Sequence, residues 1–271
     1  MLGKLMKHEL WATAHAMLPI IGEMLLVAVM GNVCVRLGNG HDLPAAVNII
    51  IMLVMVLFFV GIFAIGLVTV YMMVRRFRDN LLRDEGYIMH TLPVSVHAQI
   101  WSKVLVSALW YALAAVTVVA AAVLLTFGAD TVRIIGDLFK TLYDVFTQGD
   151  GHIAEILVEF LAVLVLASLA LSLSFDAALS VGHSFARHKM AASVAVYIGF
   201  LILGQIALSF AARLTVMTNF YGYLDAPYVD VYEFITYWRG ICGAEAGLLV
   251  LEGAFCYGVT ALFLKRRLNL E

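Results

Sequence analysis

Five acidic residues lie inside long apolar stretches of this sequence, and they are the side chains best placed to do chemistry. They are Glu23, Glu159, Asp176, Glu245 and Glu252. A charged group at the centre of a bilayer costs at least ~2.5 kcal/mol, so such a residue tends to persist where it has a task or a partner. These acids are therefore the first candidates for a substrate pathway or for a contact between subunits.

Asp176 belongs to a polar stripe in the run SLALSLSFDAALS. Ser168, Ser172 and Ser180 stand four or eight residues from Asp176, which places all four side chains on one face of a helix. Such a stripe is typical of a pathway or a subunit contact, but helix packing through small residues and hydroxyls explains it at least as well. The candidate set for a pathway or subunit seam is Glu23, Glu159, Ser172, Asp176 and Glu252.

The sequence lacks the motifs of several enzyme classes. An ATP-hydrolysing P-loop needs GxxxxGK[ST], and the only Gly-Lys pair, Gly3-Lys4, stands too near the start of the chain to complete one. There is no HExxH zinc motif and no GxSxG nucleophile elbow, and His183 and His188 have a poor spacing for one helical face. We therefore predict that the chain is not an enzyme, binds no metal and holds no cofactor of its own.

The composition places the chain in a membrane. Only 13% of its 271 residues are charged and 63% are hydrophobic, whereas about 25% charged residues is usual in soluble domains. A helix needs about 20 mainly apolar residues to cross the hydrocarbon core. Six stretches meet this requirement: Met17 to Leu37, Val47 to Val74, Ile100 to Phe127, Ile156 to Val181, Ser193 to Val216 and Ala244 to Leu264. The predicted fold is an all-α membrane protein with about six transmembrane helices, forming one transmembrane domain over residues 1–271.

The charges of the loops set the orientation of these spans. If the N-terminus is cytoplasmic, twelve of the 17 lysines and arginines lie on the inner side and five on the outer side. Cytoplasmic loops are enriched in Lys and Arg. We therefore predict that both termini are cytoplasmic.

The first 18 residues, within MLGKLMKHELWATAHAMLP, have the pattern of an amphipathic helix. Leu2, Leu5, Met6 and Leu10 gather on one face, among charged neighbours. Such a helix suits the plane of the membrane interface, and Pro19 stands where the chain would turn to cross the bilayer. The alternative is a simple extension of the first span.

Two outer segments carry different patterns. Residues 128–154 repeat apolar residues at helical spacing between Gly128 and the cluster at residues 149–151, which predicts an outer amphipathic helix. It would shield the ends of the spans, cap a pathway or bind a partner. Residues 217–243 are rich in Tyr, Phe and Trp among acids, which favours an aromatic belt at the outer interface over a ligand cage.

The inner loop at residues 75–98 carries the sharpest local motif. Arg75, Arg76 and Arg78 would hold the end of the second span at the anionic inner leaflet. The run RDEGYIMHTLPVS then predicts a short helix with acids at its start, which Pro93 ends because it disfavours the helical state of the residue before it. A short exposed helix on the cytoplasmic surface suits insertion into a groove of a soluble partner.

At these residues the chain resembles the membrane subunits of type-2 ABC exporters, in particular the short six-span permeases found beside drug- and peptide-resistance ATPases in Gram-positive bacteria. The resemblance is carried by DEGYIMHTLPVS, the following Ser102-Lys103, the N-terminal segment MLGKLMKHELWATA and the six-span layout. It implies that the loop is the coupling helix that contacts the ATPase. The implied contact residues are Asp84, Glu85, Gly86, Tyr87, His90, Thr91, Leu92 and Pro93.

The resemblance implies a function that none of the residues above establishes by itself. The chain would be a permease half that pairs with a second copy or a homologue, among membrane lipids and without nucleic acid. Partner ATPase subunits would bind ATP and Mg, and an amphipathic peptide, drug or lipid would be exported across the bacterial cytoplasmic membrane. Two alternatives stay open, namely a regulatory or scaffolding subunit of an ATPase complex without transport, and a membrane-embedded enzyme.

Overall fold

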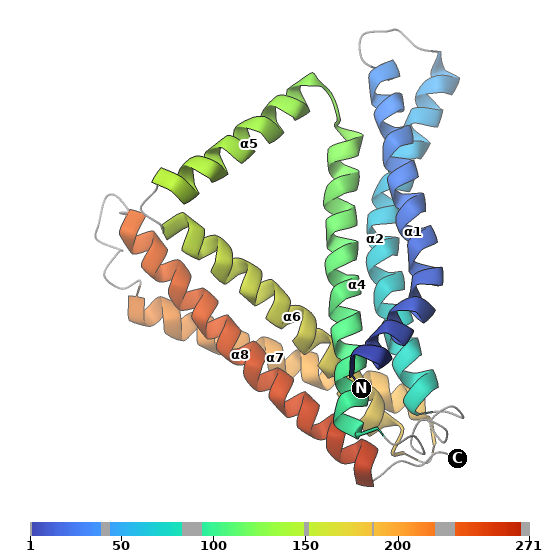
Figure 1. Ribbon diagram of the computed structural model, residues 1–271, viewed down its shortest axis with the longest axis vertical. Helices are drawn as coiled ribbons and strands as arrows, with labels where there is room; N and C mark the ends of the chain where they lie inside the picture. Colours follow the sequence, from blue (N-terminus) through green and yellow to red (C-terminus); the bar gives the residue numbers. More distant parts are fainter. Residues whose placement is uncertain are drawn as a thin grey trace. The chain divides into compact units, whose positions relative to one another are not determined.

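The computed structural model describes residues 2–38, 44–82, 94–148, 152–185, 187–219 and 231–266. Within these residues the chain forms seven α-helices and no strands (Figure 1). The helices are α1 (Leu2–Gly38), α2 (Ala45–Leu81), α4 (Val96–Leu125), α5 (Ala129–Gln148), α6 (His152–Gly182), α7 (Lys189–Asn219) and α8 (Val231–Arg266). The predicted all-α fold is therefore confirmed.

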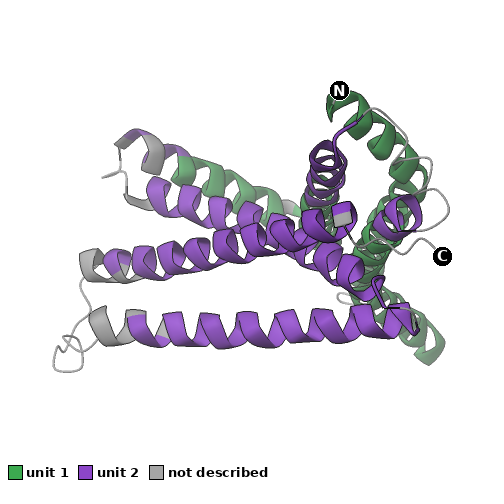
Figure 2. Ribbon diagram, turned by 90° about the horizontal axis from the view of Figure 1, so that it is seen from below, with its two compact units in different colours: residues 1–75, 109–142 green, residues 76–108, 143–271 purple. Residues whose placement is uncertain are grey.

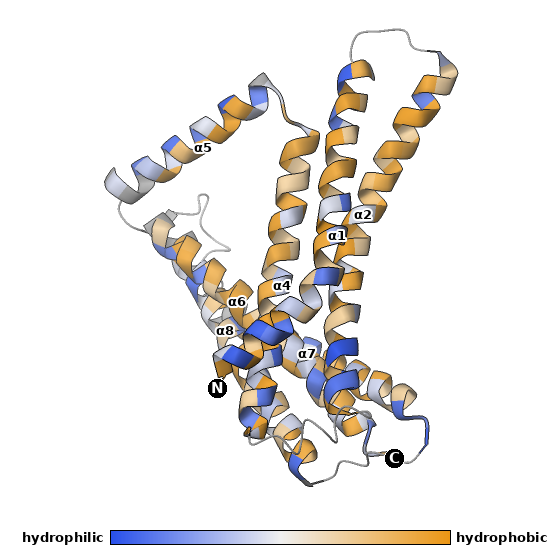
Figure 3. Cartoon of the chain, turned by 45° about the vertical axis from the view of Figure 1, so that its right-hand side comes forward, coloured by the Kyte–Doolittle hydropathy of each residue, from blue (hydrophilic) through white to orange (hydrophobic). Residues whose placement is uncertain are grey.

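Six of these helices are long and apolar enough to cross a membrane, and they coincide with the six predicted stretches. Large apolar side chains point away from the protein along them, and Phe63 and Leu67 on α2 are 74% and 71% exposed. Figure 3 shows hydrophobic colouring over most of the length of α2. Because surfaces of this kind are stable in hydrocarbon and not in water, the chain is a multi-pass membrane protein.

The first helix differs in one respect from the expectation of a separate interfacial segment. Residues 2–38 form one continuous helix of 37 residues with Pro19 inside it. Figure 1 shows the N-terminal part of α1 turning away from the axis of the rest, as a proline inside a helix produces. At ~55 Å, α1 is longer than the ~30 Å hydrocarbon core. The amphipathic segment and the first span are thus two parts of α1.

The helices group into two compact units, coloured separately in Figure 2. One unit comprises residues 1–75 and 109–142, and the other comprises residues 76–108 and 143–271. Both α2 and α4 are shared, so that each contributes one end to the second unit. The single permease domain predicted for residues 1–271 stays a prediction.

The first unit is held by an apolar core between α1, α2 and α4. Its buried members are Met24, Ala28, Phe58, Ile65, Ala114 and Ala121. Polar contacts join α1 to α4 on either side of this core. Thr13 accepts a 2.8 Å hydrogen bond from the buried indole Nε1 of Trp110, while Asn32 Nδ2 donates to the carbonyl oxygens of Leu125 and Phe127 at 2.9 Å. The last two bonds satisfy carbonyls that the end of α4 leaves without helical partners.

The second unit packs α6, α7 and α8 against one another, together with the last turns of α2 and the first turns of α4. Phe77 and Leu81 near the end of α2 are 1% and 0% exposed, and Ile100 and Val104 near the start of α4 are both fully buried. These four apolar residues anchor the two ends of the 83–93 loop in the unit that contains α6 to α8. The loop itself lies outside the described residues.

The two outer segments take different forms. The predicted amphipathic helix after Gly128 forms α5, on which Ile134, Leu138 and Phe139 are all exposed. In the aromatic segment 217–243, residues 220–230 lie outside the described part, while α7 extends to Asn219 and α8 begins at Val231. The aromatic residues after Val231 therefore continue directly into the last span.

The close approach of α6 and α7 generates a stability prediction. A Cβ atom at Gly182 would lie 2.5 Å from the backbone N and Cα of Ser193, and both residues are buried. Because backbone atoms move less easily than a flexible side chain, Gly182→Ala should destabilise the protein by about 1–3 kcal/mol. Thermal unfolding of the solubilised protein measures the loss.

Gly199→Ala is the matched control, since a Cβ at that position of α7 meets nothing within 4 Å. Its melting temperature should equal or slightly exceed that of the parent, because alanine favours the helix over glycine. Equal melting temperatures for Gly182→Ala and Gly199→Ala would show that the close contact carries no strain.

Candidate functional site

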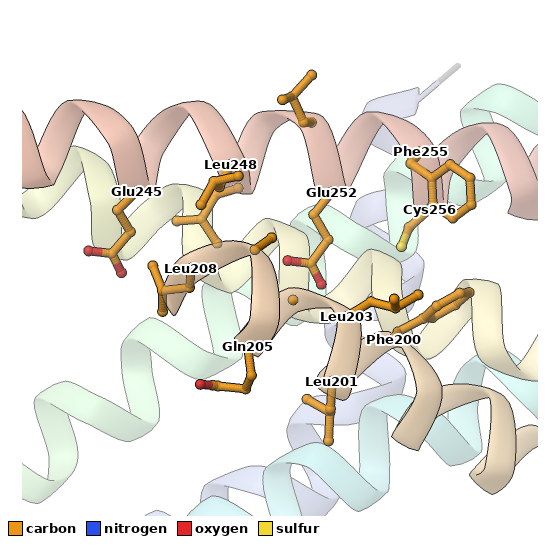
Figure 4. A pocket seen from close by; sticks show the side chains of 14 residues that line it. Phe200, Leu201, Leu203, Gln205, Leu208, Glu245, Leu248, Glu252, Phe255 and Cys256 are labelled. Atoms are coloured by element: carbon orange, nitrogen blue, oxygen red, sulfur yellow. The ribbon is translucent and has the colours of Figure 1, made fainter. Parts of the chain in front are cut away.

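A cavity of about 390 Å³ lies between α7 and α8 of the second unit. Most of its wall is aliphatic or aromatic, including Phe200, Leu203 and Leu208 on α7 and Leu248 and Phe255 on α8 (Figure 4). Several of these side chains are well exposed at the protein surface, so the cavity opens sideways. For a membrane helix pair, that opening faces lipid.

Two carboxylates stand on the α8 wall of this cavity. Glu245 and Glu252 are seven residues apart, which places them on one face of the helix about 10 Å apart along its axis. Both side chains are half-buried. In Figure 4 the carboxylate of Glu252 reaches toward α7 and that of Glu245 lies nearer to Leu208. The cavity is therefore lined mainly by apolar side chains, with two acidic side chains on its α8 side.

The α7 wall leaves room for one of these carboxylates. A Cβ added at Gly204 would lie 3.8 Å from Glu252 Oε2, so the absence of a side chain there opens the space in front of the acid. The Gln205 amide extends away from α8 in Figure 4. None of the residues that line the cavity, all of which are described, is Lys, Arg or His. The electrostatic character of the cavity is consequently negative.

A different arrangement neutralises the acids nearer the start of α6. Arg239 of α8 forms an ion pair with Glu155, and its Nε lies 3.4 Å from Glu159 Oε1. The guanidinium thus joins α6 to α8 close to the N-terminal ends of their apolar parts. Glu159, one of the predicted pathway residues, is therefore held by a cation of the same chain.

The polar stripe of α6 is buried against the same unit. Ser172, Asp176 and Ser180 are each 4–6% exposed. The two serine hydroxyls donate to carbonyl oxygens of their own helix, that of Ser172 to Ser168 at 3.0 Å and that of Ser180 to Asp176 at 2.7 Å. The hydroxyls are therefore satisfied locally, and the side chains face other helices of this chain instead of its surface.

The carboxyl of Asp176 needs a partner outside its helix, and α4 supplies one. Lys103, which is 6% exposed, acts electrostatically on Asp176. Lys103 belongs to the Ser102-Lys103 pair that follows the inner loop in the sequence. The pair therefore connects the beginning of α4 to the middle of the α6 polar stripe.

A second polar contact connects the beginning of α4 to α8. His97 Nδ1 is hydrogen-bonded to the hydroxyl of Tyr257, and Lys265 Nζ donates to His97 Nε2 at 2.8 Å. The ring of Trp101, one turn further along α4, lies 5.7 Å from that of Tyr257. Since Nε2 accepts from an ammonium group, Nδ1 carries the proton that is donated to Tyr257. This cluster ties α4 to the last turns of α8.

The predicted site residues thus fall into separate environments. Asp176 and Ser172 are buried in the second unit, Glu159 is paired, Glu252 lines the cavity, and Glu23 is exposed on α1 of the first unit. All eight predicted ATPase contacts, Asp84 to Tyr87 and His90 to Pro93, lie outside the described residues. In the part of the chain that is described, no three His, Cys, Asp or Glu side chains come together as a metal site.

Sequence reasoning missed two members of this arrangement. Glu245 was not included in the candidate set, although its spacing of seven residues from Glu252 places both on one helical face. His97 had no recognisable motif, because its partners Tyr257 and Lys265 are 160 and 168 residues away. Only the tertiary structure brings these groups together.

The burial of Asp176 and Lys103 predicts a strong energetic coupling. Lys103→Met removes the buried cation that acts electrostatically on Asp176 and should destabilise the protein by about 1–3 kcal/mol. Replacing both residues, with Asp176→Leu added, should recover at least about 1 kcal/mol of that loss. Chemical or thermal unfolding of the two single variants and the double variant measures this coupling energy.

Lys140→Met is the control, because Lys140 is exposed on α5 and its replacement should leave stability unchanged. Strictly additive effects of Lys103→Met and Asp176→Leu would mean that the two charges do not stabilise each other.

Comparison of the chain with protein-family models, with curated proteins and with solved structures found no match in any of the three.

Proposed function

We propose that the chain is the membrane subunit of an ATP-driven ABC exporter in the bacterial cytoplasmic membrane. It pairs with a second copy or a homologue and moves an amphipathic peptide, drug or lipid. The ATPase subunits, which are separate proteins, bind ATP and Mg. The 83–93 loop transmits their motion to the membrane helices.

The observation that carries the proposal is the way both ends of the loop are built into the second unit. On one side Phe77 and Leu81 are buried, and on the other side Ile100 and Val104 are buried. A force applied to the loop therefore acts on packed helix ends and not on flexible connections. An ATPase-coupling element needs this property, because a compliant connection would absorb the motion.

The contacts of α4 extend this coupling toward the cavity. Lys103 acts on Asp176 of α6, and His97 binds Tyr257 of α8. Tyr257 stands five residues after Glu252, which is less than two helical turns away. Displacement of the first turns of α4 would therefore also displace the part of α8 that lies close to the carboxylates of the cavity.

The two competing functions receive less support. An enzyme would need converging polar residues, but Glu159 and Asp176 are separated by about 25 Å along the axis of α6 and have different partners. A regulatory subunit would need the anchored loop but has no use for an acidic cavity that opens toward lipid. The cavity therefore favours transport over regulation alone.

The proposal predicts the loss of an ATPase partner when the loop is altered. The tagged chain is expressed in its native host, solubilised gently and purified with its partners. A P-loop ATPase should co-purify with the parent protein. The double variant Glu85→Ala, Tyr87→Ala should recover at least about tenfold less of it, because a few side chains carry most of the binding energy of an interface and Tyr is among the commonest of them.

The matched control is Glu23→Ala, Tyr71→Ala, which removes the same residue types from exposed positions on α1 and α2. It should retain the ATPase. Equal recovery from the two double variants, or no ATPase from the parent even after mild cross-linking, would contradict the exporter hypothesis.

A second prediction concerns transmission after the ATPase has bound. Cys256 lines the cavity and is 1% exposed. Because a maleimide reacts with the thiolate, which forms only where water reaches the thiol, the labelling rate of Cys256 reports on opening of the α7–α8 region. In the complex, ATP with Mg should change its labelling rate several-fold. His97→Ala should abolish this ATP dependence while ATPase binding persists, since it removes the contacts with Tyr257 and Lys265.

Labelling is followed by mass spectrometry of the peptides, with Cys34 of the first unit as the internal reference. His15→Ala is the matched variant, because the hydrogen bond and the ring contact described for His15 both join it to Trp11, one turn away on the same helix. If ATP-dependent labelling survives in His97→Ala, the His97 cluster is not a transmission element.

A further inference from the structure

The acidic cavity between α7 and α8 has a composition that selects one kind of ligand. Its walls combine aromatic and aliphatic side chains with the carboxylates of Glu245 and Glu252, and none of its lining residues is cationic. An apolar molecule of positive charge would satisfy both parts of this lining at once. A neutral molecule would leave the carboxylates unused, and an anion would be repelled by them.

Glu252 is the more informative of the two acids because of what surrounds it. Among the described residues no donor forms a hydrogen bond or an ion pair with its carboxylate, whereas Glu159 on α6 is held by Arg239. The charge of Glu252 acts instead on Tyr197 and Cys256, which are not cations. A carboxyl group in an apolar surrounding keeps its proton unless a counter-charge stabilises the ionised form. The chain itself supplies such a charge to Glu159. For Glu252, the counter-charge would have to come from a bound ligand.

The shape of the cavity agrees with entry of such a ligand from the membrane. Leu201, Leu203 and Leu251 border the cavity and are 47%, 65% and 68% exposed, so that its mouth is apolar. Gly204 keeps the space opposite Glu252 free of a side chain. A volume of about 390 Å³ is within the usual range of pockets for small organic molecules.

We infer that the α7–α8 cavity is a binding site for lipophilic organic cations, with Glu252 as the primary counter-charge and Glu245 as a second one along the same wall. This inference names the substrate class of the proposed exporter and rests on that function for its role in transport. The binding itself requires no ATPase, so it can be measured on the isolated chain.

The test uses two probes of nearly identical shape and opposite charge. Tetraphenylphosphonium and tetraphenylborate are measured separately by equilibrium dialysis against the purified chain in nanodiscs of zwitterionic lipid, with empty nanodiscs as the background. Saturable binding of the cation, without saturable binding of the anion, is the expected result. Glu252→Gln should weaken cation binding by about tenfold or more, because the amide keeps the shape and removes the charge.

Two matched controls separate the site from general effects of substitution. Asp137→Asn removes an exposed carboxylate from α5, in the other unit, and should leave binding unchanged. Gly204→Leu should abolish binding by filling the cavity, whereas Gly199→Leu adds the same side chain to α7 at a position with no neighbour within 4 Å and should preserve it. Monodisperse elution of each variant shows that it folds.

The results that would overturn the inference are distinct from those that would overturn the exporter hypothesis. Equal uptake of both probes, or uptake that none of the variants changes, would mean simple partition into an apolar surface. A change of oligomeric state in Gly204→Leu, without cation binding by the parent, would mean that a second copy of the chain covers the cavity. If the chain binds the cation but recovers no ATPase, the binding site is supported and the exporter hypothesis is contradicted.

Discussion

The hydrocarbon core offers no hydrogen-bond partner, and the placement of the polar side chains in the spans follows from this constraint. Ser172 and Ser180 donate to carbonyls of their own helix, and the Trp110 indole donates to Thr13 across two helices. Asp176 has the buried cation Lys103 nearby. Each of these side chains therefore has a polar or charged group of the same unit nearby. Glu245 and Glu252, both half-buried on the cavity wall, are the exceptions among the described buried or half-buried acids of the spans, and this sets the cavity apart from ordinary packing.

The last turns of α2 and the first turns of α4 belong to the second unit and are packed within it. At 37 residues, α2 is longer than the hydrocarbon core requires. Its last turns therefore continue beyond the lipid, and there they pack as tightly as a soluble core, with Phe77 and Leu81 almost completely buried. The same holds for the first turns of α4, where Ile100 and Val104 are buried. The described chain stops at residue 82 and resumes at residue 94, next to these packed ends.

The sequence predicts the parts of this fold that depend on one helix at a time. The six spans follow from apolar length, and α5 follows from helical periodicity between Gly128 and the glycines at residues 149–151, which bound Ala129–Gln148 closely. Contacts between helices cannot be predicted in this way. The spacing of residues along α6 does not indicate that Glu159 meets Arg239 or that Asp176 lies near Lys103. The position of Pro19 suggested a separate first helix, but α1 continues through it, because membrane helices tolerate a proline inside them.

Glu245 and Glu252 lie on a segment of α8 that is attached to other helices at both of its ends. Arg239 fixes the N-terminal part of α8 to α6, and Tyr257 fixes its C-terminal part to His97 of α4. The two fixed points are about 27 Å apart along the helix, and both carboxylates lie between them. A sharp bend in the helix between these two contacts would break backbone hydrogen bonds, so the segment between them moves as one piece. Any shift of His97 relative to Arg239 must therefore tilt the segment that carries the acids, and this tilt changes the width of the space facing Gly204.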